Sequence, residues 1–185
     1  MLSKHQVSAM HGCHTLKLGV HRDQRGSFSK VLSSQLQEQA EISFMPRELF
    51  WSRSSQGVLR GMHIQLPPHA GAKVVWVSQG EVQDVVLDLR IDSASYGACL
   101  VSHLDDSSGG LYIPTGCAHG FEVLSDVAVV NYAQDVDHAP THDSGIAWNS
   151  FQFDWLTQNP IMSDRDKNLP IFSKFESPFT MSNSK

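Results

Sequence analysis

Apolar and polar side chains alternate through much of the chain up to residue 134, and this pattern predicts β-strands. The run Lys-Val-Val-Trp-Val-Ser at 73–78 is rich in β-branched and aromatic residues, and Gln79 and Gly80 form a tight turn before the run 81–90. Further strands are predicted at 15–20, 27–32, 48–54, 99–104, 111–113, 118–123 and 127–134. Strands at short intervals with turn residues between them indicate a sandwich or barrel.

Helical patterns are few. Ser34-Gln-Leu-Gln37 fits a capping box and predicts a short helix through about Glu41, while 21–26 reads as a turn. From Asn159 on, a proline-containing segment without strand periodicity predicts loops and a short helix packed on the barrel. We therefore expect an all-β fold in one domain, 1–185, with its barrel core at about 45–135 and a few short peripheral helices.

The stretch Gly57-Val-Leu-Arg-Gly-Met-His-Ile-Gln65 combines strand alternation with chemistry. Simple alternation places Leu59, His63 and Gln65 on one face, with Arg60 on the other. Glycine inside a strand often marks a bulge or a close approach by another group, as expected here at Gly61. The stretch reads as the wall of a barrel with a ligand inside. A half-buried strand whose polar side chains face water is the alternative.

Composition narrows the class of protein. The 185 residues fit one domain with a proper core, and the formal charge of −5 argues against nucleic acid as the main partner. We expect no membrane partner, because no run approaches 18 apolar residues and the first ten lack the apolar core of a signal peptide. Cys13, Cys99 and Cys117 are scattered, as expected for reduced thiols in a cytoplasmic protein.

A second informative stretch is Ile113-Pro-Thr-Gly-Cys-Ala-His-Gly-Phe121. Its Pro-x-Gly-x-x-His pattern resembles the second half-motif of the cupin barrel. Metal-binding cupins supply His-x-His and Glu from the first half-motif, whereas this chain has His63-x-Gln65 followed by Lys73. Two histidines and an amide beside an ammonium would hold a metal weakly, so we expect a barrel without metal.

Taken together, the motifs from about Val20 to Trp155, with Asp166 beyond, resemble those of the dTDP-4-dehydrorhamnose 3,5-epimerase family. The matching pieces are Asp23-Gln-Arg-Gly26 with Phe28, Gly57-Val-Leu-Arg-Gly-Met-His63 with Gln65, Lys73-Val-Val, Gly80-Glu-Val-x-Asp84, Asp88-Leu-Arg90, Ile113-Pro-x-Gly-x-Ala-His-Gly-Phe121, Leu124-Ser-Asp126, Tyr132 and Gly145-Ile-x-Trp-Asn149. The resemblance implies a cupin-type jelly roll, a homodimer, and action without cofactor or metal on a nucleotide-linked 4-keto-6-deoxy sugar.

Epimerisation next to a ketone removes a proton to give an enolate and returns one to the opposite face. Imidazole is the natural base near neutral pH, and the resemblance gives that role to His63. It gives Asp166 the role of orienting His63, with Asp164 as the alternative if the alignment slips by two. Tyr132 becomes the partner acid. Lys73 would stabilise the enolate oxygen, a role whose removal costs ~10²–10³ in rate.

Other residues are expected around the substrate. By resemblance His119 lies near the ketone oxygen or a sugar hydroxyl, and Gln65 beside the substrate. Arg60 and Arg25 are candidates for the diphosphate, because guanidinium matches phosphate geometry. Phe28 would pack on the sugar or base. Arg60, Arg25 and Phe28 could equally be surface charges and core filler.

The departures from the family concern the substrate surround. Lys30, Glu48 and Phe50 replace a common Glu, Gln and Asn, and 136–138 replaces a region that often carries two tyrosines. We therefore expect the chemistry to persist while the substrate differs, either in its nucleotide or sugar or in being epimerised at one of the two carbons. A metal-dependent cupin enzyme and a catalytically silent sugar-nucleotide binder are the alternatives. A related ketoisomerase group usually has paired histidines, which His63-x-Gln65 does not match.

Overall fold

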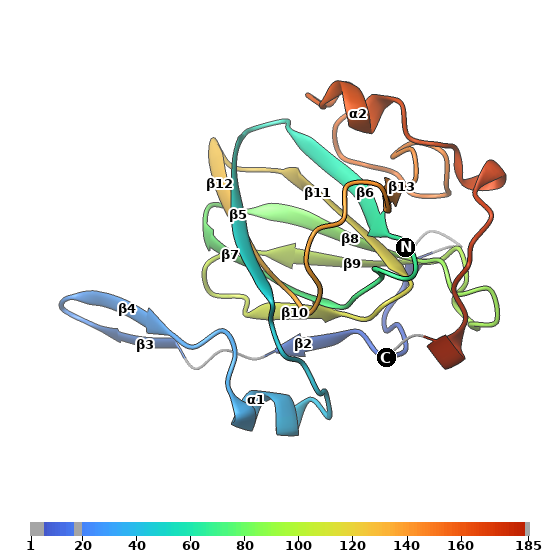
Figure 1. Cartoon of the computed structure of the whole chain (residues 1–185). Coiled ribbons are helices and arrows are strands. Elements are labelled where there is room, and N and C mark those ends of the chain that lie inside the picture. Colours follow the sequence, from blue (N-terminus) through green and yellow to red (C-terminus); the bar gives the residue numbers. More distant parts are fainter. Residues whose placement is uncertain (1–5, 17–19, 184–185) are drawn as a thin grey trace.

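Two mostly antiparallel β-sheets stacked face to face form a barrel in the computed structural model, which describes residues 6–16 and 20–183 (Figure 1). The six-stranded sheet runs β1 (Gln6–Val7), β9 (Cys99–Leu104), β8 (Val82–Asp88), β11 (Cys117–Val123), β6 (Leu59–Gln65) and β13 (Asp143–Gly145). The five-stranded sheet runs β2 (His14–Leu16), β10 (Gly110–Ile113), β7 (Lys73–Gln79), β12 (Val127–Gln134) and β5 (Glu48–Ser55). This arrangement confirms the predicted all-β jelly-roll class.

Apolar side chains fill three layers. The strand alternation places Val75 and Val130 of one sheet against Val86 and Phe121 of the other, and all four are buried between the sheets. A second cluster covers the outer face of the six-stranded sheet, where the segment after β13 contributes Ile146, Phe151, Trp155 and Phe179. A third covers the outer face of the five-stranded sheet beneath α1. Apolar clusters therefore cover the outer faces of both sheets, and the polar side chains on the inner faces lie in the barrel interior.

A β-bulge at Gly61 sets which side chains of β6 face that interior. Against β11, His63 pairs with His119 but Arg60 pairs with Phe121, so β6 has one extra residue there. The predicted alternation is therefore wrong on one side of the bulge. Arg60 faces inward with His63 and Gln65, whereas Leu59 is in the outer cluster.

Gly61 is required by this geometry, as its position in the sequence indicated. Its φ is +120°, and an added Cβ would lie 2.6 Å from the Gly120 Cα. The two glycines therefore let β6 and β11 approach closely beside the interior.

Most predicted elements are present, with shifted boundaries. The strands at 99–104 and 127–134 match β9 and β12. The predicted strand 15–20 corresponds to β2 up to Leu16, since residues 17–19 lie outside the described part. The turn predicted at 21–26 is instead a hairpin of β3 (Val20–Asp23) and β4 (Gly26–Ser29), because only residues 24 and 25 turn.

The helices are short and peripheral, as predicted. They are α1 (Ser34–Gln39), α2 (Asp164–Lys167), and the 3₁₀ turns η1 (Phe172–Lys174) and η2 (Met181–Asn183). The N-cap of α1 is Ser33, whose hydroxyl accepts the Leu36 N–H, so the predicted capping box began one residue late.

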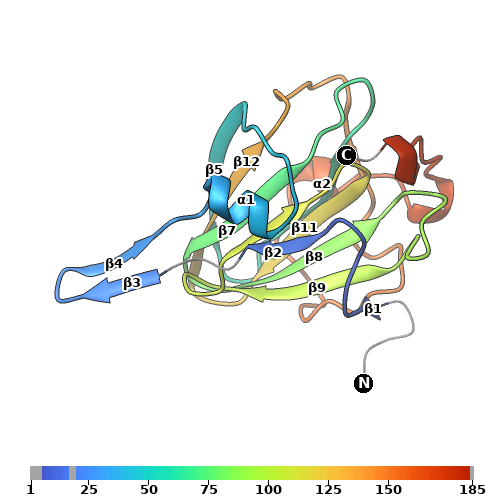
Figure 2. The same cartoon turned by 90° about the horizontal axis from the view of Figure 1, so that it is seen from below.

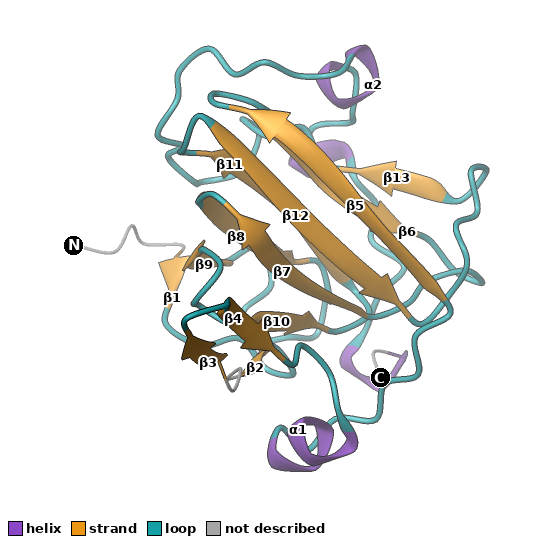
Figure 3. Ribbon diagram, turned by 90° about the vertical axis from the view of Figure 1, so that its left-hand side faces the viewer, coloured by secondary structure: helices purple, strands orange, loops and turns teal. Residues whose placement is uncertain are grey.

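Two parts of the chain stand at the margin of the barrel. The β3–β4 hairpin projects away from both sheets (Figures 1 and 2). Strand β5 forms one edge of the five-stranded sheet, with β12 as its hydrogen-bonded neighbour (Figure 3). Within the described residues, no helix is long and apolar enough to cross a membrane.

Candidate active site

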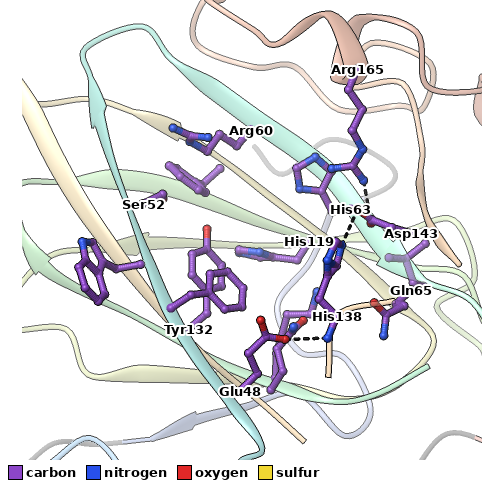
Figure 4. Close-up of a pocket in the computed structure, with 16 residues that line it drawn as sticks. Glu48, Ser52, Arg60, His63, Gln65, His119, Tyr132, His138, Asp143 and Arg165 are labelled. Carbon is purple, nitrogen blue, oxygen red and sulfur yellow. Dashed lines mark hydrogen bonds and ion pairs between the residues drawn. The ribbon is translucent and has the colours of Figure 1, made fainter. Parts of the chain in front are cut away.

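A cavity of about 410 Å³ opens between the two sheets (Figure 4). This volume suits a small-molecule ligand. Its lining comes from β5, β6, β7, β11, β12 and β13 with the loops beside them. The polar and aromatic lining residues are Glu48, Phe50, Trp51, Ser52, Arg60, His63, Gln65, Lys73, His119, Phe121, Tyr132, Gln134, His138, Asp143 and Arg165.

His63 is held by a carboxylate. Its Nε2 lies 2.8 Å from Asp166 Oδ1, and the imidazole is 31% exposed while the carboxylate is 5% exposed. The second carboxylate oxygen accepts the Gly61 N–H at 3.2 Å. An ionised carboxylate can only accept, so Nε2 carries the proton and Nδ1 keeps the lone pair.

Burial alone would raise the pKa of Asp166, but the hydrogen bond and charge of His63, together with Gly61 N–H and Ser163, lower it below its ordinary value.

Helix capping decides which acid faces His63. Ser163 caps α2 and accepts the Asp166 N–H, so Asp166 is turned inward. Asp164 is 97% exposed and pairs with Lys167. The geometry therefore favours Asp166 over the alternative, Asp164.

A second His–carboxylate pair lies deeper. His119 Nε2 is 2.7 Å from Asp84 Oδ2, and both side chains are buried. Asp84 belongs to β8, where it stands among Val82 and Val86 on the face that looks into the barrel. Sequence reasoning assigned Asp84 no role, although an acid inside an apolar alternation is a signal for one.

Tyr132 presents its phenol to the cavity from β12. Figure 4 shows the phenol oxygen directed inward, with the His119 ring beside it. Burial and the charge of Asp84 raise the pKa of Tyr132, while Ser52 and Arg60 oppose the rise. The phenol is therefore protonated at neutral pH.

Two cationic side chains that the sequence analysis named, Lys73 and Arg60, line the cavity. Burial lowers the pKa of Lys73, and the charges of Asp143 and Asp84 oppose the change. Arg60 donates from Nε to Ser54 Oγ at 3.0 Å. Lys73 enters from β7 and Arg60 from β6.

Gln65 lines the cavity, but its amide is engaged. Its Nε2 donates to the carbonyls of His69 and Asp137, and its Oε1 accepts the Ala139 N–H. Gln65 therefore joins two loops at the mouth, and its role as a substrate contact stays a prediction.

Four charged or polar groups lie together at the mouth of the cavity. Asp143 pairs with Arg165 at 2.7 Å and with His138 at 3.2 Å, and Glu48 accepts the His138 backbone N–H at 2.7 Å. Except for Glu48, these residues stand in a loop, in the four-residue helix α2 or in the three-residue strand β13, where alternation carries no signal.

Two predicted substrate contacts lie outside the cavity. Arg25 forms an exposed ion pair with Asp23 in the β3–β4 hairpin, and Phe28 on the same hairpin is 59% exposed. Their role as substrate contacts stays a prediction. Lys30 is exposed just after β4.

Within residues 6–16 and 20–183, the His, Cys, Asp and Glu side chains form no group of three or more that could hold a metal ion. In the cavity, His63 and His119 each direct Nε2 to a carboxylate. The expectation of a metal-free site remains a prediction for elemental analysis.

Fold and site define a cupin-type barrel with an acid–base pocket. The family described as dTDP-4-dehydrorhamnose 3,5-epimerase matches residues 8–174. A dTDP-4-dehydrorhamnose 3,5-epimerase of Shigella flexneri is 37% identical over 155 residues, which cover 80% of this chain and 84% of that protein. A dTDP-4-dehydrorhamnose 3-epimerase of Streptomyces niveus is 37% identical over 126 residues, 66% of this chain and 61% of that one.

Among solved structures, the dTDP-4-dehydrorhamnose 3,5-epimerase of Bacillus anthracis with TDP and PPi bound superposes with a TM-score of 0.83 at 32% identity, covering 86% of this chain and 94% of that one. The chain belongs to the dTDP-4-dehydrorhamnose 3,5-epimerase family. It is an isomerase of the epimerase type.

Proposed function

We propose that this chain inverts a carbon next to the ketone of a dTDP-linked 4-keto-6-deoxy sugar, in deoxysugar biosynthesis. One observation carries the proposal: the His63–Asp166 pair and the Tyr132 phenol enter the same cavity from different strands, β6 and β12. An inversion needs a base and an acid at different faces of one carbon. The named activities of the relatives support the choice of substrate.

His63 is the base. Its Nε2–H is donated to Asp166, so the lone pair on Nδ1 takes the proton from the carbon next to the ketone. The carboxylate then faces an imidazolium at 2.8 Å and stabilises it. The product of this step is an enolate whose negative charge gathers on the former ketone oxygen.

Lys73 and His119 serve that oxygen. The ammonium of Lys73 lies in a buried part of the cavity, where its charge acts on an enolate more strongly than in water. The Asp84 carboxylate takes the Nε2–H of His119, so a neutral ring can accept from an adjacent hydroxyl at Nδ1, whereas a protonated ring can donate from Nδ1 to the enolate oxygen.

Tyr132 is the acid. Its raised pKa keeps the phenol protonated until the enolate forms, and its oxygen faces the cavity. Donation of the phenol proton to the carbon completes the inversion. The resulting phenolate and imidazolium return to neutral by exchange with solvent.

Arginines provide the charge for the diphosphate. Arg60 is oriented by Ser54, and Arg165 stands at the mouth beside Asp143. Both are available to phosphate oxygens in a bidentate geometry.

We also propose that the chain acts as a homodimer, with the β3–β4 hairpin of one copy reaching the cavity of the other. The hairpin carries Arg25 and Phe28 away from its own barrel. The β5 edge beside the cavity exposes 68% of Leu49 and 71% of Trp51, an apolar surface suited to a second copy. Sedimentation should give twice the chain mass, and Arg25→Ala should raise KM for the sugar nucleotide.

The three free cysteines support a cytoplasmic location.

Solvent deuterium tests the reaction. In heavy water with deoxythymidine-diphospho-4-keto-6-deoxyglucose, proton NMR should show deuterium at C3, C5 or both, with inversion. His63→Ala should abolish the incorporation. His103→Ala is the matched control, because this exposed histidine on β9 lies outside the cavity. Absence of exchange with this and other 4-keto sugar nucleotides would favour a silent sugar-nucleotide binder instead.

A further inference from the structure

Phe50 lies flat on Tyr132. The two residues are cross-strand partners in the β5–β12 register. Their ring centroids are 4.6 Å apart and the planes differ by 12°. Such a stacked pair is a favourable aromatic arrangement that buries one face of each ring.

A second ring also contacts the Tyr132 phenol. His119 meets Tyr132 edge-on, with centroids 5.9 Å apart and an interplanar angle of 71°. Since Asp84 fixes His119 in turn, the Tyr132 ring contacts both a fixed imidazole and the Phe50 ring. Swinging the phenol would break both ring contacts.

Phe50 is the outer member of the stack. It is 38% exposed, whereas Tyr132 is 9% exposed. It belongs to β5, the edge strand of the five-stranded sheet in the described part of the chain. Phe50 therefore covers one face of the catalytic phenol ring and is itself partly open to solvent.

We propose that Phe50 is a positioning residue for Tyr132: it fixes the phenol toward the enolate and keeps water from it. This inference rests on the proposed function, in which Tyr132 is the acid. It also gives a physical role to one of the departures from the family, the Phe at a position that commonly carries Asn.

The role has a kinetic signature, because the enolate has two fates. The proton on His63 Nδ1 exchanges with solvent and can return to the face it left, which labels the carbon without inverting it. Alternatively the Tyr132 phenol gives its proton to the other face, which inverts the carbon. A residue that positions Tyr132 controls the ratio of exchange to inversion, whereas a residue that merely supports the fold changes both rates together.

The experiment compares Phe50→Leu, Phe50→Tyr and the wild type in heavy water with deoxythymidine-diphospho-4-keto-6-deoxyglucose. Proton NMR follows label and configuration at each carbon. We expect Phe50→Leu to raise the ratio of exchange to inversion about tenfold, with KM changed less than about threefold. We expect Phe50→Tyr, which keeps a ring at this position, to have the wild-type ratio. Tyr96→Leu is the matched control, because Tyr96 is 41% exposed and contacts Phe172 outside the cavity.

An unchanged ratio in Phe50→Leu, or an equal change in Tyr96→Leu, would overturn the inference. If Phe50→Leu does not fold, Phe50→Met keeps similar bulk without a ring face and takes its place.

A second measurement does not depend on turnover. In protein with ¹³C-labelled tyrosine, the Tyr132 phenol is assigned with Tyr132→Phe and titrated by NMR. Loss of the covering ring should lower the pKa of Tyr132 in Phe50→Leu, because burial is the largest cause of its rise. An unchanged pKa would overturn the inference. If the wild type showed no exchange while this shift was present, the proposed reaction would fail but the covering of Tyr132 by Phe50 would stand.

Discussion

Replacing Asp166 with Asn removes one charge from the site with little change in shape. Asp166→Asn keeps an oxygen to accept the Gly61 N–H, but it can no longer stabilise an imidazolium as a carboxylate does. Its amide can also donate to His63 Nε2, which would favour the tautomer with the proton on Nδ1, the atom that should act as base.

The magnitude follows from the geometry. The Nε2–Oδ1 distance is 2.8 Å, which places the delocalised charge centres about 4 Å apart. At an effective dielectric constant of about 20, the attraction is about 4 kcal/mol. If the proton is half transferred in the transition state, about 2 kcal/mol is lost, or about 30-fold in kcat, and full transfer would give about 10³-fold. We expect a fall of about 10²-fold once the tautomer change is included.

The assay is initial-rate deuterium incorporation by NMR, with thermal unfolding to check that the variant is folded. Asp164→Asn is the matched control, since its side chain is exposed and two residues away, and it should stay within about twofold of the wild type. A folded Asp166→Asn with near wild-type exchange, or an equal loss in Asp164→Asn, would refute the assignment of Asp166 as the partner of the base.

Three further outcomes are expected. The lowered folded-state pKa of Asp166 implies a stability contribution that is present above the ordinary carboxyl pKa and is lost as pH falls through the folded value. The difference in melting temperature between wild type and Asp166→Asn should therefore shrink from pH 6 to pH 3. A constant difference contradicts this. Lys73→Met should lower kcat ~10²–10³-fold with a smaller change in KM, because enolate charge is present in the transition state and not in the substrate; a change confined to KM contradicts it. Gly61→Ala should lower the free energy of unfolding, measured in urea, by about 3 kcal/mol or more, because its Cβ would meet the Gly120 backbone at 2.6 Å. Gly57→Ala should lower it by about 1–2 kcal/mol, because Gly57 has a φ of +76° but nothing lies within 4 Å of its Cβ position.

The sequence predicted the strands well where alternation runs uninterrupted, as at 99–104 and 127–134. It failed at Arg60, because a single extra residue at a bulge moves a side chain to the other face of its strand. The turn 21–26 was misread because its polar residues form a hairpin outside the core, where burial imposes no alternation.

For the site, the resemblance named His63, Lys73, Tyr132 and His119, which the fold brings to one cavity. It left Asp166 and Asp164 as alternatives, because the choice depends on the capping of a four-residue helix. The Asp84–His119 bond depends on the register of two strands that are distant in sequence, and no local pattern reports it.

The inward turn of Asp166 ties catalysis to the last part of the chain. Its carboxylate contacts β6 at Gly61 and at His63, 103 residues earlier in sequence. During synthesis, the barrel strands are complete long before this carboxylate leaves the ribosome. The nascent protein should therefore gain activity only after the segment that carries Asp166 has docked on β6. A chain shortened before Asp166 would leave a barrel with its base unoriented.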